Sequence, residues 1–389
     1  MRRHLHLTGL ALALILSGCS IFGGEEEDES EQPMALTEVQ SSIDLKRVLS
    51  TKIGDSGENL RLALRPAGDG TRVYVANADG EVTAFDAKTH RKVWSRKLKS
   101  KLTSGPGVGE GVVIVAEGNG SVLALDARTG EDLWESNIAA EVLAPSVIAG
   151  GRVLLRTVDG RLLALDADDG ALLWFVEQPV PRLSQRGTGA PVVSGDAVIA
   201  GFDNGRIMGV GLLDGEKLWE LPLGIPSGRS DIDRMVDADG AIAAVGNDLY
   251  VTGFRARTAA IAAESGQAMW AREFSSYAGL GVDWANVYLT LDNDRILALS
   301  RQNGAQEWSN EQLLRRQVTA PVGFGEYAVV GDFEGYLHFL SVGTGLFAGR
   351  VRVGNSPIVN RPYVMGNTLY AQSAGGQVVG YQIRTNEKD

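Results

Sequence analysis

The chain has 389 residues but a single cysteine, Cys19, and only four histidines. One cysteine excludes an internal disulfide, so the stability of the fold has to come from a large packed core. His4 and His6 lie within residues 1–18, which are predicted below to be a cleaved signal peptide. Only His90 and His338 then remain. Two histidines are too few for a histidine-rich zinc site, and they offer only two candidate bases for a Ser-His-Asp arrangement. We therefore expect no metal and no catalytic residue.

Basic residues are also scarce, with 37 Lys and Arg against 48 Asp and Glu and a formal net charge of −11. This balance argues against nucleic acid as a partner. Acidic residues are concentrated between positions 25 and 31, and such a run cannot bury a core. We expect it to be part of a solvated tether.

An apolar run at residues 7–16 follows Arg2 and Arg3 and is too short for a membrane span of about 20 residues. This order is typical of a secretory signal peptide. The run ends in Leu-Ser-Gly-Cys, which resembles the bacterial lipobox, whose cysteine is lipidated and becomes the first residue. That resemblance implies lipidation of Cys19, and Ser20 after it implies the periplasmic side of the outer membrane of a Gram-negative bacterium. The alternative is a cleavage site with an incidental cysteine.

A phrase close to Asn/Asp-Gly-x-hydrophobic-x-Ala-Leu-Asp-Ala-x-x-Gly-x-x-x-Trp recurs along the chain. Its spacing between the first three copies is 40 residues, the length of a four-stranded propeller blade. The Asn/Asp-Gly pairs predict type I′ hairpin turns. The recurring tryptophans are predicted to pack neighbouring blades together and are Trp94, Trp134, Trp174, Trp219, Trp270 and Trp308.

Eight copies predict an all-β, eight-bladed propeller, with seven blades as the alternative. The seventh copy has Gly349 in the tryptophan position, and the eighth stops before it. Residues 46–50 resemble the strand around Trp94, so we expect an N-terminal strand to close the ring beside residues 378–383, with Leu49 in the tryptophan position. The predicted organisation is a signal peptide (1–18), a lipidated acidic tether (19–40), the propeller (41–385) and a short tail (386–389).

Two spacings exceed the period. Trp174 to Trp219 is 45 residues and Trp219 to Trp270 is 51. The extra residues fall within 178–189 and 224–240, so both insertions are predicted on the same rim of adjacent blades. Insertions gathered on one face often form a binding surface, although tolerated surface loops remain an alternative.

The docking repeat resembles that of pyrroloquinoline-quinone (PQQ) dehydrogenases, which are eight-bladed periplasmic enzymes. That resemblance implies a quinone cofactor and calcium. However, many members of that family have an adjacent cysteine pair, which this chain lacks. Residues 166–169 with Glu177 outline a calcium loop, but Ala171 stands where such a loop needs glycine.

The insertions carry a more specific resemblance. Leu-Ser-Gln-Arg-Gly at 183–187, Asp-Asn-Gly-Arg at 203–206 and Ile-Asp-Arg-Met-Val-Asp-Ala-Asp at 232–239 resemble the BamB family, lipoprotein subunits of the outer-membrane β-barrel assembly machinery. The resemblance covers nearly the whole chain. It implies a non-enzymatic scaffold, without cofactor, that binds the periplasmic POTRA domains of BamA and works with the other subunits. The contact positions that it implies are Leu183, Gln185, Arg186, Asp237 and Asp239.

The residue types in this patch suit such a contact. Leu183 provides an apolar anchor, Arg186 a planar fork for carboxylates, and Asp237 and Asp239 accept hydrogen bonds. Alternatively, Arg186 pairs with the two aspartates across the rim. Two other functions remain open from the sequence, a PQQ-dependent dehydrogenase and a holdase that binds unfolded outer-membrane proteins at strand edges.

Overall fold

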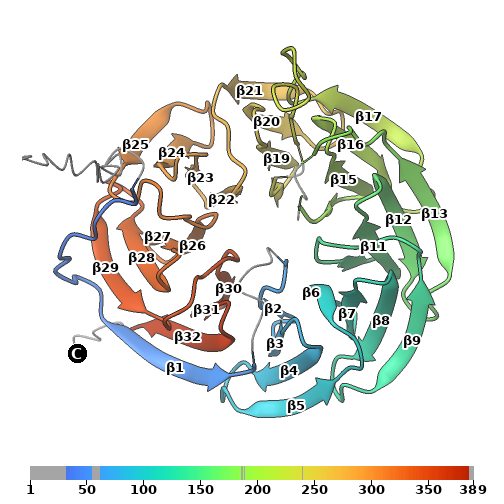
Figure 1. Cartoon of the computed structure of the whole chain (residues 1–389), viewed down its shortest axis with the longest axis horizontal. Coiled ribbons are helices and arrows are strands. Elements are labelled where there is room, and N and C mark those ends of the chain that lie inside the picture. The colour runs from blue at the N-terminus through green and yellow to red at the C-terminus, as the bar shows by residue number, and fades with distance from the viewer. Residues whose placement is uncertain (1–31, 55–61, 185–186, 188, 239, 385–389) are drawn as a thin grey trace, which may run out of the picture. The chain divides into compact units, whose positions relative to one another are not determined.

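The computed structural model describes residues 32–54, 62–184, 187, 189–238 and 240–384. The chain divides into two units, Met1–Gln32 and Pro33–Asp389. The second unit is a ring of eight four-stranded antiparallel sheets (Figure 1). The predicted eight-bladed, all-β propeller is confirmed. The predicted signal peptide, Cys19 and residues 386–389 lie outside the described residues.

Each blade has four strands, counted here from the ring axis outward. The innermost strands are β2 (Ala67–Gly68), β6 (Leu102–Gly109), β10 (Val147–Ala149), β14 (Val192–Ser194), β18 (Ala243–Val245), β22 (Leu280–Val282), β26 (Val322–Phe324) and β30 (Tyr363–Met365). The second strands are β3 (Arg72–Ala76), β7 (Val112–Glu117), β11 (Arg152–Arg156), β15 (Ala197–Gly201), β19 (Asp248–Val251), β23 (Asn286–Thr290), β27 (Tyr327–Gly331) and β31 (Thr368–Gln372).

The third strands are β4 (Glu81–Asp86), β8 (Ser121–Asp126), β12 (Arg161–Asp166), β16 (Arg206–Gly211), β20 (Thr258–Ala262), β24 (Ile296–Ser300), β28 (Tyr336–Ser341) and β32 (Gln377–Ile383). The outer strands are β5 (Lys92–Lys97), β9 (Asp132–Asn137), β13 (Leu172–Glu177), β17 (Lys217–Pro222), β21 (Ala268–Arg272), β25 (Gln306–Asn310), β29 (Phe347–Arg352) and β1 (Leu45–Lys52). Blades are numbered from β2–β5 as the first.

The hairpin between the second and third strands differs from the prediction. In the third blade Gly160 has φ of 88°, whereas Asp159 before it is not in the left-handed region. Gly160 N donates to Thr157 O, and Thr157 N donates to Arg161 O. This is a longer loop whose last residue alone is left-handed, a common alternative to the two-residue turn. The type I′ prediction is therefore wrong, although the hairpins lie where it placed them.

The six repeat tryptophans join each blade to the next. Each indole Nε1 donates to a carbonyl in the turn before the following blade's outer strand, at 2.8–3.1 Å; the pairs are Trp94–Ala127, Trp134–Ala167, Trp174–Leu212, Trp219–Ala263, Trp270–Arg301 and Trp308–Val342. The glycine of the same turn lies against the ring. A Cβ on Gly266 would come within 2.6 Å of Trp219, and its φ is 67°. The glycine and tryptophan of the repeat therefore form a matched pair.

The two ends of the chain meet in the eighth blade, where β1 pairs antiparallel with β32. Leu49 lies opposite Gly380, in the register that Trp94 has in the first blade. The predicted closing strand and the place of Leu49 are confirmed. In the first blade His90, with φ of 56°, stands where the repeat has glycine. Leucine is smaller than tryptophan, which leaves room for the Cβ of a residue at that turn.

The structure explains why the seventh blade has Gly349 in the tryptophan position. The eighth blade takes its outer strand from the other end of the chain, so it has no turn on which a tryptophan could dock. Ile43 fills the space instead, since a Cβ on Gly349 would lie 2.5 Å from Ile43 Cγ2. Ser42 N donates to Ala348 O at 2.8 Å and holds this segment on the blade.

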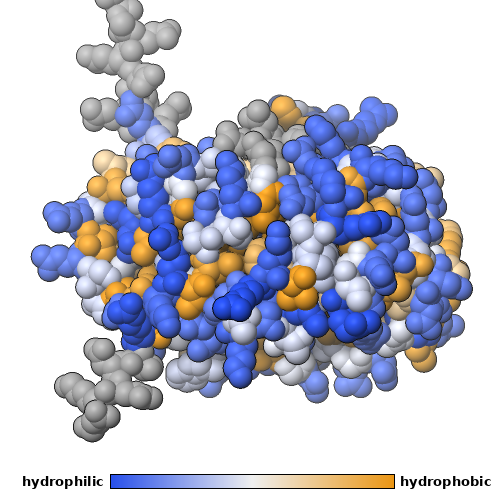
Figure 2. All heavy atoms as spheres, turned by 90° about the horizontal axis from the view of Figure 1, so that it is seen from below, coloured by the Kyte–Doolittle hydropathy of each residue, from blue (hydrophilic) through white to orange (hydrophobic). Residues whose placement is uncertain are grey.

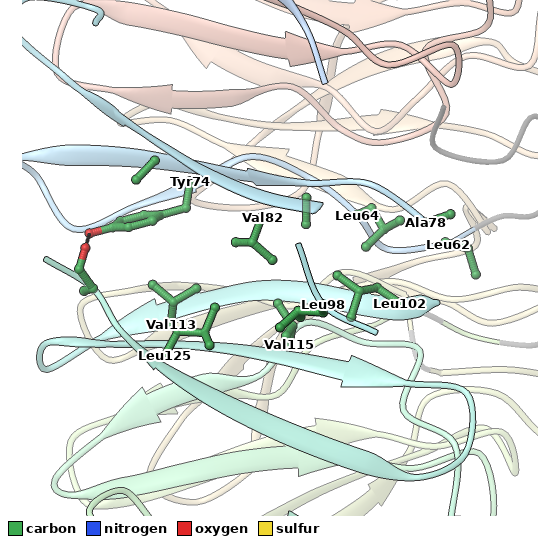
Figure 3. Packing of buried hydrophobic residues seen from close by; sticks show 13 residues of the cluster. Leu62, Leu64, Tyr74, Ala78, Val82, Leu98, Leu102, Val113, Val115 and Leu125 are labelled. Carbon is green, nitrogen blue, oxygen red and sulfur yellow. Dashed lines mark hydrogen bonds between the residues drawn. The ribbon is translucent and has the colours of Figure 1, made fainter. Parts of the chain in front are cut away.

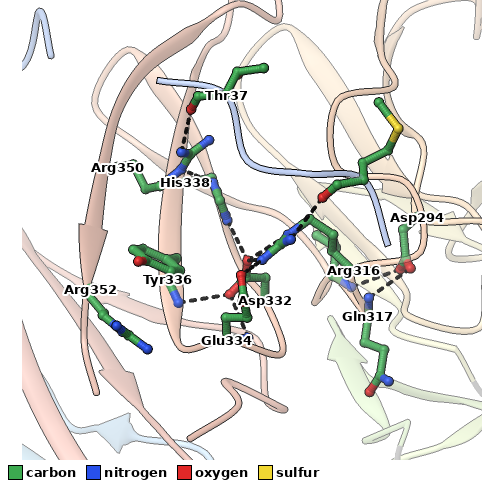
Figure 4. Close-up of polar contacts among 12 residues, drawn as sticks. Thr37, Asp294, Arg316, Gln317, Asp332, Glu334, Tyr336, His338, Arg350 and Arg352 are labelled. Carbon is green, nitrogen blue, oxygen red and sulfur yellow. Dashed lines mark hydrogen bonds and ion pairs between the residues drawn. The ribbon is translucent and has the colours of Figure 1, made fainter. Parts of the chain in front are cut away.

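Residues 33–44, here called the N-terminal strap, are held by two arginines (Figure 4). Arg316 Nη1 donates to Met34 O at 2.9 Å, and Arg350 Nη1 donates to Thr37 O at 2.8 Å. Met34 and Thr37, which lie within the segment predicted as tether, thus contact the ring.

Both arginines belong to a buried cluster. Arg316 pairs with Asp332 at 2.8 Å, and His338 Nε2 lies 3.0 Å from the same carboxylate oxygen. Arg350 Nε donates to His338 Nδ1 at 3.1 Å, so the imidazole is neutral with its proton on Nε2. Burial lowers the pKa of His338, and Asp332 opposes this only in part.

The core is divided among the interfaces between blades. Figure 3 shows the cluster between the first and second blades, which includes Leu64, Tyr74, Val82, Leu102, Val113 and Leu125. Burial of such apolar surface contributes about 25 cal/mol per Å². On the face that Figure 2 shows, apolar side chains are interspersed with polar ones. The core therefore runs around the ring and leaves the rims free to vary.

Candidate functional site

Two long loops lie on one rim of the ring. The first, residues 178–189, joins β13 to β14, and the second, residues 224–240, joins β17 to β18. Gln178 N donates to Gly160 O, a hairpin glycine, at 2.9 Å, and the same contact recurs before the second loop. The two insertions therefore share a rim with the hairpins between second and third strands, as the spacing predicted. We call it the insertion rim.

The insertions expose apolar side chains to solvent. Ile225 is 76% exposed and Ile232 is 61% exposed, and Val180 and Leu183 in the first insertion are exposed as well. Ile225 is among the most exposed large apolar side chains that the structure describes, and all four residues belong to the two insertions. Such groups commonly mark a site of protein contact.

The tip of the second insertion is held in one conformation. Ser230 N donates to Asp233 Oδ2 at 3.1 Å, and Asp233 N donates to Ser230 Oγ at 3.1 Å. Arg255, on the hairpin of the fifth blade, donates to Ile232 O at 2.6 Å and to Asp233 O at 3.1 Å. The hydrogen bonds from Ser230 lower the pKa of the Asp233 carboxyl. This turn presents Ile232 outward on a defined backbone.

The later part of the second insertion turns inward. Val236 is buried and packs on Gly224 and Gly205. Asp237 is only 3% exposed, and its N donates to Phe254 O at 3.0 Å. The residues after the exposed tip therefore anchor the loop between the fourth and fifth blades.

Polar contacts support the base of the first insertion. Asn204 Nδ2 donates to Gln178 Oε1 at 2.9 Å, which links the outer strand of the third blade to the hairpin of the fourth. Beneath this contact Arg156 and Asp203 form a buried ion pair at 2.5 Å, and Arg156 Nε donates to Gly201 O at 2.8 Å. Polar contacts therefore hold the base of the first insertion, whereas its exposed residues Val180 and Leu183 are apolar.

The structure locates two of the five predicted contact residues. Leu183 is exposed on the first insertion, whereas Asp237 is buried at the base of the second. Gln185, Arg186 and Asp239 lie outside the described residues. The predicted alternative, a pairing of Arg186 with Asp237 and Asp239, is not tested, because Arg186 and Asp239 lie outside the described residues.

Sequence reasoning missed three apolar residues of the rim as contact candidates, Val180, Ile225 and Ile232. A signal existed, because they lie in the two insertions and outside the strand register, where an aliphatic side chain has no assigned core position. Arg255 had no such signal, since its contacts depend on two loops meeting in space.

Among the residues that the structure describes, no group of three or more His, Cys, Asp or Glu is arranged to hold a metal ion. The described part of the chain also contains no helix that is long and apolar enough to cross a membrane.

Comparisons with known proteins agree with this architecture. The family model described as "Outer membrane protein assembly factor BamB" matches residues 50–310. A protein of that name from Pseudomonas aeruginosa is 46% identical over 379 residues, covering 97% of this chain and 99% of that protein. The Escherichia coli protein of that name is 35% identical over 386 residues, covering 97% and 98%.

Solved structures show the same likeness. The crystal structure of BamB from Moraxella catarrhalis has a TM-score of 0.79 and 29% identity, covering 87% of this chain and all of that one. A quinohemoprotein alcohol dehydrogenase from Comamonas testosteroni has a TM-score of 0.71, covering 89% of this chain and 78% of that one. Its 13% identity shows a shared fold only. The chain belongs to the BamB family of outer membrane protein assembly factors.

Proposed function

We propose that this protein is a non-catalytic scaffold of outer-membrane protein assembly. Its insertion rim binds the periplasmic POTRA region of BamA, in concert with the other subunits of the machinery. The observation that carries the proposal is the exposure of Ile225 and Ile232 on the second insertion, which breaks the blade repeat. Family membership supports the process, and the rim supports the place of contact.

The contact combines an apolar centre with polar groups around it. Ile225, Ile232 and Leu183 become buried against the partner, which is where interfaces gain most of their energy. Arg186 and Gln185 add hydrogen bonds to partner carboxylates or backbone. Asp237 and Asp239 complete the site, and Asp237 acts by fixing the loop rather than by direct exposure.

The protein is held at the outer membrane, on its periplasmic side, by a lipid on Cys19. Residues 1–18 direct export and are removed, and the acidic tether spaces the ring from the bilayer. The membrane is contacted through this anchor alone.

Co-purification from detergent-solubilised outer membranes tests the proposal. Tagged wild type should capture a large barrel protein with POTRA domains, and the double variant Ile225→Asp with Ile232→Asp should lose it. Trp284→Asp is a matched control, because this tryptophan is 84% exposed on the turn between β22 and β23, away from the insertion rim. Retention of the barrel by the double variant would remove the rim from the interface.

A second, compatible role is the capture of unfolded outer-membrane proteins. The outer strand β13 is an open edge with exposed Leu172, Leu173 and Phe175. Such an edge can pair with an extended chain. We expect the isolated protein to slow aggregation of an unfolded barrel protein, and Phe175→Lys to reduce that effect while leaving BamA capture intact.

A further inference from the structure

A cavity of about 1080 Å³ lies at the centre of the ring, between the innermost strands. Its volume slightly exceeds that of typical small-molecule sites, so a small molecule fits within it. Its lining is mostly small or apolar and includes Pro145, Ala190, Ala241 and Ala320. Two arginines, Arg65 and Arg361, also line it.

The two arginines break the repeat. The eight blades can be aligned by the last residue of each innermost strand that pairs with the second strand, such as Met365 with Thr368 or Ala149 with Arg152. In the first blade this residue is Asp69, whose N donates to Arg72 O. Arg65 and Arg361 each lie four residues before the aligned residue. The other six blades have small or apolar residues there, namely Gly105, Pro145, Ala190, Ala241, Gly279 and Ala320.

The arginines lie on neighbouring blades, the first and the eighth, where the ring closes. Each is followed by a proline, Pro66 or Pro362, which fixes the backbone at the start of the strand. Both arginines therefore lie directly before an innermost strand, next to a proline that restricts the backbone.

Charge at this point of the cavity is not balanced by the described residues. Neither Arg65 nor Arg361 forms an ion pair with a described carboxylate, and Arg361 Nε is buried without a hydrogen-bond partner. Burial lowers the pKa of both guanidiniums, and repulsion from Arg65 further lowers that of Arg361, to about 10. Two like charges kept together without a partner cost stability.

The carboxylates that line the cavity lie on other blades than the two arginines. Asp292 accepts hydrogen bonds from Tyr277 N at 3.0 Å and from Ser275 Oγ at 2.5 Å, and Asp237 lies at the base of the second insertion. Neither is among the groups that act on the pKa of Arg361. The positive charge is thus confined to one side of the cavity.

We propose that Arg65 and Arg361 form an anion site in the central cavity, which binds a small molecule through a carboxylate or phosphate group. The planar guanidinium matches both oxyanions in a two-point contact, and the open Nε of Arg361 supplies one donor of that fork. The bound oxyanion offsets the repulsion between the two cations. Residues of both insertions also line the cavity, but the two arginines lie on the first and eighth blades, away from the blades that carry the insertions. The anion site does not depend on the proposed BamA contact.

Thermal unfolding of the full chain in detergent, with inorganic phosphate or succinate as probes, tests the site. Sodium chloride at equal ionic strength is the reference. Wild type should gain about 2 °C or more over chloride with at least one probe, through selective binding to the folded state. A larger gain with phosphate indicates a phosphate group on the ligand, and a larger gain with succinate indicates a carboxylate.

Arg361→Gln and Arg65→Gln should each lose that gain. In chloride, each should melt at or above the wild-type temperature, because the repulsion is relieved. Arg91→Gln, on an exposed turn, removes the same charge and should keep the wild-type response. The proposal is overturned if neither probe shifts the wild type relative to chloride, or if the two cavity variants respond as strongly as Arg91→Gln. General salt effects on stability act on all four proteins alike.

Discussion

Replacement of Trp219 by alanine tests how the repeat holds the ring together. The indole is 9% exposed, packs in the cluster between the fourth and fifth blades, and donates to Ala263 O at 2.8 Å. Loss of a buried tryptophan typically costs about 3–5 kcal/mol of unfolding free energy, including the cavity that it leaves. We expect a loss in this range, measured by urea unfolding at neutral pH and followed by far-UV circular dichroism.

The facing glycine gives an independent measure of the same contact. Gly266→Ala places a Cβ against the indole of Trp219 at a φ of 67°, so it should cost about 2–4 kcal/mol from backbone strain and overpacking together. Trp284→Ala removes an exposed indole and should cost less than about 0.5 kcal/mol. The reasoning is refuted if Trp219→Ala costs less than about 1 kcal/mol, or no more than Trp284→Ala.

The other predictions concern buried charge. Burial lowers the folded-state pKa of His338 below its ordinary 6.5, so the unfolded chain takes up the proton first. The free energy of unfolding should therefore fall as the pH drops below about 6.5. His338→Gln should make this pH dependence weaker. The lowered pKa of Asp332 adds a further loss at more acidic pH, because the unfolded chain again takes up the proton before the folded chain does. Urea unfolding between pH 5 and 8 measures the first effect, and a wild-type curve with no slope would contradict it. Asp203→Ala breaks a buried ion pair with Arg156 and should lower the free energy of unfolding by about 3–5 kcal/mol. Arg96→Ala breaks an exposed ion pair with Asp132 and should lower it by less than about 1 kcal/mol. Equal losses in urea unfolding would contradict this difference.

The fold could be predicted because the repeat encodes each interface twice, once in the tryptophan and once in the facing glycine. Even the closing strand was readable, since Leu49 retains the spacing of the tryptophan strands. The hairpin geometry was not, because Asp-Gly and Asn-Gly suit both a two-residue turn and a longer loop with glycine last. The Asp-Gly or Asn-Gly pair predicts where the hairpin lies. The register of the two paired strands determines the length of the loop between them.

The insertion rim and the anion site could likewise be predicted only in part. The insertions could be placed from spacing alone, and both lie on the predicted rim. Exposure could not be inferred, because Ile232 and Val236 belong to one short motif, yet one points outward and the other is buried. Arg65 and Arg361 are nearly 300 positions apart in sequence, and only ring closure brings their blades together. The sequence around either arginine does not indicate the other.

Direct binding of the purified protein to the purified POTRA region of BamA is the measurement closest to the central proposal. Isothermal titration should show a saturable complex with the wild type, and Ile232→Ala should weaken it by at least about tenfold, as expected for a central apolar contact. Trp284→Ala should bind as the wild type does. Absence of binding, or equal affinity for Ile232→Ala and the wild type, would contradict the insertion rim as the scaffold surface.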